Sequence, residues 1–121
     1  MTVPPDWIIP DWPAPPGVKA LITTRSGGVS RGPYASCNLG LRTDDAPEAV
    51  AENRRRLRAL LPQEPKWLTQ VHGTCAVNAD ELTGMPQADA SFAYRAGTVC
   101  AVLTADCMPL LLCDRDGNAV A

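Results

Sequence analysis

One stretch of this 121-residue chain, about residues 46–61, carries apolar residues at the spacing of an amphipathic helix. The apolar side consists of Ala46, Ala49, Val50, Leu57, Leu60 and Leu61, and Asn53 interrupts it. Asp45 is placed to cap the N-terminus, Pro47 suits the first turn, and Glu48 stands three residues on, as in a capping box. Pro62 then ends the helix.

Several other runs are rich in β-forming residues, and three of them predict strands: residues 18–24, 98–104 and 108–114. The last two are continuously apolar, which is typical of strands buried on both faces. Residues 67–80 predict a strand or one arm of a hairpin. Residues 114–117 predict a turn, after which residues 118–121 begin another strand.

Prolines and a long loop divide the rest of the chain. Six of the twelve prolines fall within the first sixteen residues, which predicts an extended arm over residues 1–17 that Trp7 and Trp12 could anchor. Residues 18–121 are expected to form part of one small domain. Within it, residues 25–43 form a loop long enough to indicate a functional or mobile segment.

Charge and composition exclude some classes of partner. The net charge of −2 gives no reason to expect binding to nucleic acid or to an anionic membrane, and the arginines at 54, 55, 56 and 58 are typical of a solvated helix surface. The sequence has no membrane-spanning apolar run and no secretion signal, so we expect a cytoplasmic protein. The five cysteines include no C-x-x-C pair, and we expect free thiols that are mostly buried.

Candidate chemistry centres on His72, the only histidine of the chain, and on Cys107. Thiolate and imidazole can bind zinc, with an open position for a water that ionises near pH 7. Alternatively, the imidazole could deprotonate the cysteine for nucleophilic attack in a thiol hydrolase. The spacing of the two residues also fits a buried thiol and a hydrogen-bonded histidine without any catalytic role.

Four further residues are candidates for a site. Asp106, beside Cys107, could assist acid–base chemistry or belong to a turn at the end of a strand. Arg25, beside Ser26-Gly27-Gly28, could bind an anion such as phosphate, although a plain turn is the simpler interpretation. Asn38 could bind a ligand or cap its loop, and Gln70 is a candidate for binding substrate.

Six motifs occur in an order that resembles the YfiH family, also described as laccase-domain proteins or as peptidoglycan editing factor. They are Thr23-Thr-Arg-Ser-Gly-Gly-Val-Ser30, Pro33-Tyr-Ala-Ser-Cys-Asn-Leu-Gly40, Glu52-Asn-Arg54, Trp67-Leu-Thr-Gln-Val-His-Gly73, Ala88-Asp-Ala90 and Val102-Leu-Thr-Ala-Asp-Cys-Met-Pro109. The resemblance implies an α/β (α+β) fold, a layered sandwich of mixed sheets flanked by helices.

The resemblance also implies a function. Members of the family are described as purine nucleoside enzymes that phosphorolyse adenosine, inosine and methylthioadenosine, that deaminate adenosine, and that are linked in bacteria to correcting peptidoglycan precursors. Their zinc is held by two histidines and one cysteine, of which His72 matches the first histidine and Cys107 the cysteine. On this basis we assign Arg25 to phosphate and Asp106 to acid–base help.

The chain departs from the family pattern in one serious respect, besides Asp44, where the family commonly has a glycine. The family's second histidine belongs to a His-Ala-Gly-Trp-Arg motif that should follow Ala121, and family chains are about twice as long, so we expect an N-terminal half that lacks the third ligand. Such a half should show no normal catalysis and could self-associate through exposed strand edges. Copper is less expected than zinc because a multicopper oxidase needs many imidazoles. A cysteine-dependent hydrolase of a cell-wall precursor and a non-catalytic nucleotide-binding module remain as alternatives.

Overall fold

The computed structural model describes residues 2–121, so Met1, the first residue of the predicted arm, lies outside the described residues. The chain divides into two compact units. The first unit comprises residues 2–11 and Ala20–Leu61, and the second comprises Trp12–Lys19 and Pro62–Ala121. Among residues 2–121, no helix is long and apolar enough to cross a membrane.

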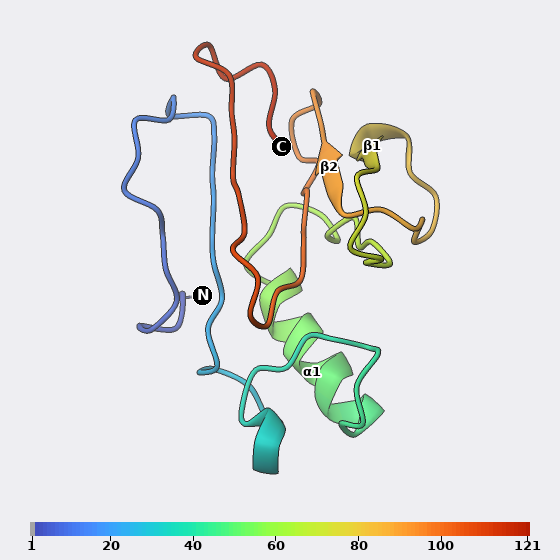
Figure 1. The fold of residues 1–121 in the computed structure, drawn as a ribbon. Coiled ribbons are helices and arrows are strands. Elements are labelled where there is room, and N and C mark those ends of the chain that lie inside the picture. Colours follow the sequence, from blue (N-terminus) through green and yellow to red (C-terminus); the bar gives the residue numbers. More distant parts are fainter. Residues whose placement is uncertain (1) are drawn as a thin grey trace. The chain divides into compact units, whose positions relative to one another are not determined.

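The helix α1 of the first unit spans Pro47–Arg58 (Figure 1), which confirms the helix predicted over residues 46–61 with a shorter C-terminal end. Its buried face consists of Val50, Asn53 and Leu57. Asn53, the polar residue that interrupts the apolar pattern, is therefore part of the buried face, and its side-chain amide forms hydrogen bonds there.

The predicted cap of α1 by Asp45 and Glu48 is wrong. The N-cap residue is Ala46, which makes no side-chain capping bond, and Asp45 Oδ1 accepts a hydrogen bond from the N–H of Ala46 at 2.9 Å. Asp45 Oδ2 is occupied elsewhere, since it accepts from the hydroxyl of Ser30 at 2.6 Å and from the amide of Asn38 at 3.1 Å. The carboxylate therefore ties the long loop to the start of the helix.

The N-terminal segment of the first unit is anchored by Trp7. This side chain is buried and donates a hydrogen bond from Nε1 to the carbonyl of Ser26 at 2.7 Å. Ile8 and Ile22 form one antiparallel bridge with two hydrogen bonds of 2.8 Å. The prediction of a full strand over residues 18–24 is wrong. Pro10, two residues beyond Ile8, has no N–H with which to extend the ladder.

The second unit contains the two named strands, β1 over Ala76–Asn78 and β2 over Ala90–Phe92 (Figure 1), which pair in parallel with Ala76 opposite Ala90. The helix and this parallel pair confirm the mixed α/β class. Of the strand predicted over residues 67–80, only β1 is a continuous strand, and the residues before it form single parallel bridges.

The strands predicted over residues 98–104 and 108–114 are reduced to single bridges at Cys100 and Cys113, and their burial on both faces is wrong. The exposed fractions reach 93% at Met108, 71% at Leu110 and 52% at Leu112. A continuous apolar run is buried only where a second layer covers each face, and no described segment covers these side chains.

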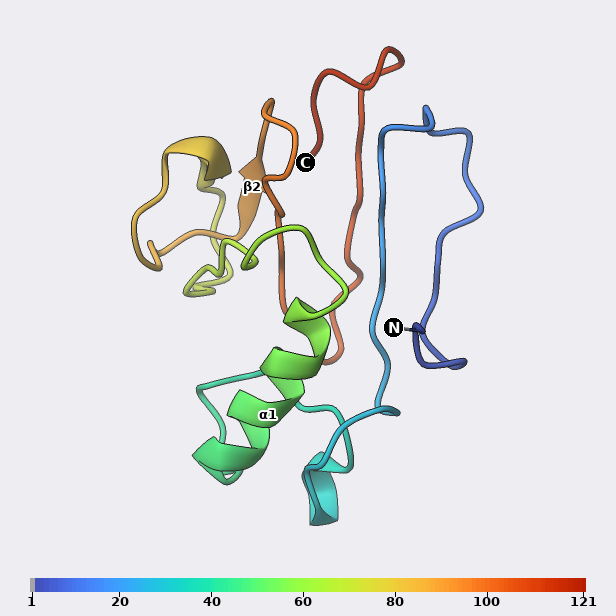
Figure 2. The ribbon, with the colours of Figure 1, turned by 180° about the vertical axis from the view of Figure 1, so that it is seen from behind.

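The turn predicted at residues 114–117 is confirmed, because the N–H of Gly117 donates to the carbonyl of Asp114 at 3.2 Å. The segment after it returns antiparallel, so that Leu112 and Ala121 exchange two hydrogen bonds and Val120 pairs with both Cys113 and Ala93. The C-terminal end therefore lies beside the residue that follows β2 (Figure 2).

Candidate functional site

Three segments of the second unit run in the same direction, and the middle one is residues 66–70. On one side the N–H of Lys66 donates to the carbonyl of Val99 at 2.9 Å, and Lys66 pairs in parallel with Cys100. On the other side Thr69 pairs in parallel with Gln87. A recess of about 20 Å³ between these segments is lined by Trp67, Leu68, Gln70, Ala88, Ala101, Val102 and Leu103. It has room for about one water molecule.

The carboxyl ends of these parallel segments carry the candidate residues. Gln70 lines the recess, and His72 follows it by two positions. Asp89 directly follows Ala88 on the neighbouring segment. On the other side, Asp106 and Cys107 follow the run of residues 98–104, in which Cys100 pairs with Lys66. The ends of parallel strands are where α/β proteins place their ligand sites.

The backbone at His72 is held in an unusual conformation. His72 has a φ of 57°, in the left-handed region that a side chain other than glycine rarely adopts, at a cost on the order of 1–3 kcal/mol. The carboxylate of Asp89 accepts hydrogen bonds from three successive N–H groups, from Val71 at 3.1 Å, from His72 at 2.8 Å and from Gly73 at 2.7 Å. These bonds, led by that of Gly73, hold the pKa of Asp89 below its usual range.

Cys107 and Asp106 lie exposed in a bend after the residue 98–104 run, and His72 is also exposed. The interpretation of Cys107 as a buried thiol is therefore wrong. All five cysteines are free, and only Cys37 is buried, so the expectation that most thiols are buried is also wrong. The exposed imidazole and thiol are accessible to a metal or a substrate.

The residues present fit zinc as a partial ligand set. Nitrogen of imidazole and sulfur of thiolate are both preferred zinc ligands, and a catalytic zinc usually has three protein ligands. Within residues 2–121, no group of three or more histidine, cysteine or acidic side chains is arranged to hold a metal ion. His72 and Cys107 thus carry donor atoms of the kind that zinc prefers, and their assignment as zinc ligands stays a prediction.

Arg25 and Asn38 belong to the first unit, where their side chains form hydrogen bonds that stabilise the long loop of residues 25–43. Arg25 donates from Nε to the carbonyl of Ala35 at 3.0 Å and from Nη2 to that of Pro33 at 3.1 Å. Asn38 accepts from the N–H of Gly40 at 3.0 Å and donates to Thr43 and Asp45. These contacts give both residues a structural role, and their assignments to phosphate and nucleoside stay predictions.

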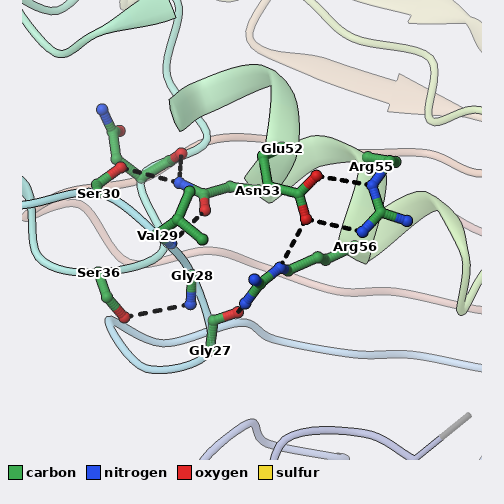
Figure 3. Close-up of polar contacts among 10 residues, drawn as sticks. Gly27, Gly28, Val29, Ser30, Ser36, Glu52, Asn53, Arg55 and Arg56 are labelled. Carbon is green, nitrogen blue, oxygen red and sulfur yellow. Dashed lines mark hydrogen bonds and ion pairs between the residues drawn. The ribbon is translucent and has the colours of Figure 1, made fainter. Parts of the chain in front are cut away.

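Sequence reasoning missed the importance of Asn53, which is fully buried and connects α1 to the long loop (Figure 3). Its Oδ1 accepts from the N–H of Val29 at 2.8 Å, and its Nδ2 donates to Ser30 Oγ at 2.9 Å and to the carbonyl of Asn38 at 2.8 Å. The signal was available, because a polar residue on an apolar helix face needs hydrogen-bond partners once it is buried.

The arginines of α1 also differ from a freely solvated surface. Glu52 forms ion pairs with Arg55 at 2.7 Å and with Arg56 at 2.9 Å, and Arg56 donates to the carbonyl of Gly27 (Figure 3). Arg54 donates to the carbonyl of Leu39 at 2.8 Å. Arg54 and Arg56 therefore connect α1 to the long loop, while Arg55 pairs with Glu52 on the helix surface.

Comparison with known proteins gives consistent results. The family model described as "Multi-copper polyphenol oxidoreductase laccase" matches residues 19–121. The chain is 54% identical over 115 residues to "Purine nucleoside phosphorylase PA4543" of Pseudomonas aeruginosa, covering 95% of this chain and 47% of that protein. It is 52% identical over 120 residues to "Purine nucleoside phosphorylase YfiH" of Escherichia coli, covering 94% and 48% respectively.

Two solved structures share the fold. The Neisseria meningitidis protein NMB0706 is 52% identical with a TM-score of 0.89, covering 95% of this chain and 48% of that one. YlmD of Geobacillus stearothermophilus is 30% identical with a TM-score of 0.85, covering 99% and 49%. The chain thus spans about half the length of the relatives that it matches. By its sequence and its fold, the chain belongs to the multi-copper polyphenol oxidoreductase laccase family, in which the YfiH proteins are its relatives.

Proposed function

We propose that the protein containing this chain catalyses the phosphorolysis of purine nucleosides, at a zinc site whose ligands include His72 and Cys107. The names of relatives that are more than 50% identical over most of the chain support the reaction. One structural observation supports the site: His72, Asp89 and Cys107 each follow one of three parallel segments of the second unit, and His72 and Cys107 are exposed. Adenosine deamination, methylthioadenosine as a substrate and a link to peptidoglycan precursors belong to the same proposal.

The reaction defines what each residue would do. An oxygen of inorganic phosphate forms a bond to C1′ of the ribose while the bond from C1′ to the purine nitrogen breaks, and the leaving purine takes up a proton. We assign the handling of that proton to Asp106. Zinc, when bound, supplies a Lewis acid beside the substrate. Arg25 is assigned to phosphate through donors other than Nε and Nη2, which bind its own loop, and Asn38 and Gln70 are assigned to the nucleoside.

The test uses the whole protein, inosine as substrate and chromatographic separation of hypoxanthine and ribose 1-phosphate. Both products should appear only when inorganic phosphate is present. His72→Ala and Cys107→Ser should each lower kcat/KM at least 100-fold. Cys75→Ser is the matched control, because Cys75 is also a free, exposed thiol of the second unit, and it should stay within about twofold of the unmodified protein.

Three results would contradict the proposal. The first is release of hypoxanthine without phosphate, and the second is activity in the Cys107→Ser protein equal to that of Cys75→Ser. The third is rapid inactivation by iodoacetamide with alkylation of Cys107 in the zinc-loaded protein, since a thiolate that binds zinc reacts slowly. That third result would favour the thiol hydrolase instead.

A further inference from the structure

We propose that Asp89 is a positioning residue for His72. Its carboxylate binds the three successive N–H groups of residues 71–73 and fixes the left-handed backbone from which the imidazole is presented at the site. This inference rests on the proposed function, because it assigns to Asp89 the orientation of a zinc ligand. Asp89 acts on the backbone of residues 71–73 and is not itself a zinc ligand.

The arrangement differs from an ordinary side-chain turn. A left-handed residue between right-handed neighbours lets successive N–H groups converge on one anion, and His72 is such a left-handed residue. The acceptor is also remote, because Asp89 lies 16–18 residues further along the chain on a separate segment. The contact therefore joins two segments of the site and not neighbouring residues of one loop.

Two other carboxylates of the second unit show the contrast. Asp114 accepts from the N–H groups of Asn118 and Ala119, within its own turn. Asp80 accepts from Tyr94 and Arg95, on a remote segment, but neither of these two donors has a positive φ. Among the residues described, His72 is the only residue other than glycine with a positive φ. The strained backbone and the carboxylate that accepts three hydrogen bonds thus occur together at His72, a candidate zinc ligand.

Asp89 itself is held by the parallel segments. Its N–H donates to the carbonyl of Cys75 at 3.1 Å, and the preceding Ala88 is fully buried and donates to the carbonyl of Thr69 at 3.1 Å. The next residue, Ala90, begins β2. The carboxylate is therefore attached to the sheet at a fixed place, which is what a residue that orients a ligand requires.

The expected effect follows from residues that orient metal ligands in other proteins, whose loss lowers metal affinity about 10–100-fold. In Asp89→Asn, one oxygen of the carboxylate becomes an NH₂ group, which cannot accept from Val71, His72 or Gly73. At least one of the three bonds is then lost, and the backbone of residue 72 is no longer held in the left-handed region.

The experiment measures zinc affinity by competition with a chromophoric chelator, and the visible spectrum of the cobalt-substituted whole protein. Asp89→Asn should lower zinc affinity about 10–100-fold and change the cobalt spectrum. The matched control is Asp80→Asn, which alters another half-buried carboxylate that accepts N–H groups from a remote segment, and it should keep zinc affinity within about twofold. An Asp89→Asn protein with unchanged affinity and an unchanged spectrum would overturn the inference.

A second measurement needs no variant and covers the case in which Asp89→Asn does not fold. In the zinc-free, unmodified protein, the amides of residues 71–73 should exchange with solvent at least ten times more slowly than in an unstructured peptide. Exchange at the unstructured rate would overturn the role of Asp89. His72→Ala separates the two claims: zinc affinity that survives this change contradicts the proposed function, whereas zinc lost in His72→Ala but kept in Asp89→Asn contradicts only the positioning role.

Discussion

Replacing Asn53 by alanine should destabilise the protein substantially. The Asn53 side chain is fully buried and makes three hydrogen bonds of 2.8–2.9 Å, two of them to the backbone of Val29 and Asn38. Each bond contributes roughly 1 kcal/mol net, and loss of the side chain leaves its partners unsatisfied, so we expect a loss of roughly 3 kcal/mol in the free energy of unfolding. Such a loss is a large part of the typical 5–15 kcal/mol of a domain.

The assay is urea and thermal unfolding of the whole protein followed by circular dichroism. In a protein of the relatives' length, roughly 3 kcal/mol corresponds to a fall in Tm of about 6–12 °C. Asn118→Ala is the matched control, because Asn118 lies exposed in the turn after Asp114, and its replacement should change stability by less than about 0.5 kcal/mol. A loss below about 1 kcal/mol in Asn53→Ala, or one equal to that of the control, would refute this account of the loop.

Three further predictions concern the helix, the loop and the thiols. Two arginine partners lower the pKa of Glu52 from 4.5 to about 2, so the stabilising contribution of this carboxylate is present above pH 4.5 and is lost as the pH falls toward 2. The Tm difference between the unmodified protein and Glu52→Gln should therefore disappear over that pH range. A Tm difference that stays constant would contradict the ion pairs. A Cβ on Gly28 would overlap the backbone of the loop and the amide of α1, so Gly28→Ala should lower Tm by several degrees, whereas Gly17→Ala, with open space around its Cβ, should leave it unchanged. Burial raises the pKa of Cys37, so mass spectrometry should find it alkylated by iodoacetamide at least tenfold more slowly than the exposed Cys75, and equal rates would show that the first unit opens.

The helix could be predicted because its signals are local. The apolar spacing of residues 46–61 and the position of Pro47 identify α1 without knowledge of any partner. The cap at Asp45 was wrong because its carboxylate is taken by Ser30 and Asn38, which lie 15 and 7 residues earlier. Such competition between remote partners has no local signature.

The strands were predicted less well because a strand depends on its neighbours. The run over residues 108–114 has the composition of a buried strand, yet Met108 and Leu110 are largely exposed and only Cys113 forms a bridge. Local composition states what a segment can bury, but not whether a covering layer is present.

The sequence proposed residues for the candidate site, and these assignments stay predictions, but it did not predict the contacts around them. The scarcity of histidine singled out His72, with Cys107 and the adjacent Asp106 as its candidate partners, and the family motifs matched His72 and Cys107 to zinc ligands. The sequence did not reveal that Asp89 binds three N–H groups around His72, because residues on different segments meet only through the parallel pairing. Motif order therefore predicts the chemistry, and the structure shows which carboxylate holds the backbone of His72.

Metal content tests the central claim most directly. Elemental analysis of the purified whole protein should find close to one zinc per chain in the unmodified protein and in Cys75→Ser, and far less in His72→Ala and Cys107→Ser. Zinc at the same level in all four proteins, or no zinc in any of them, would contradict the assignment of His72 and Cys107 as ligands.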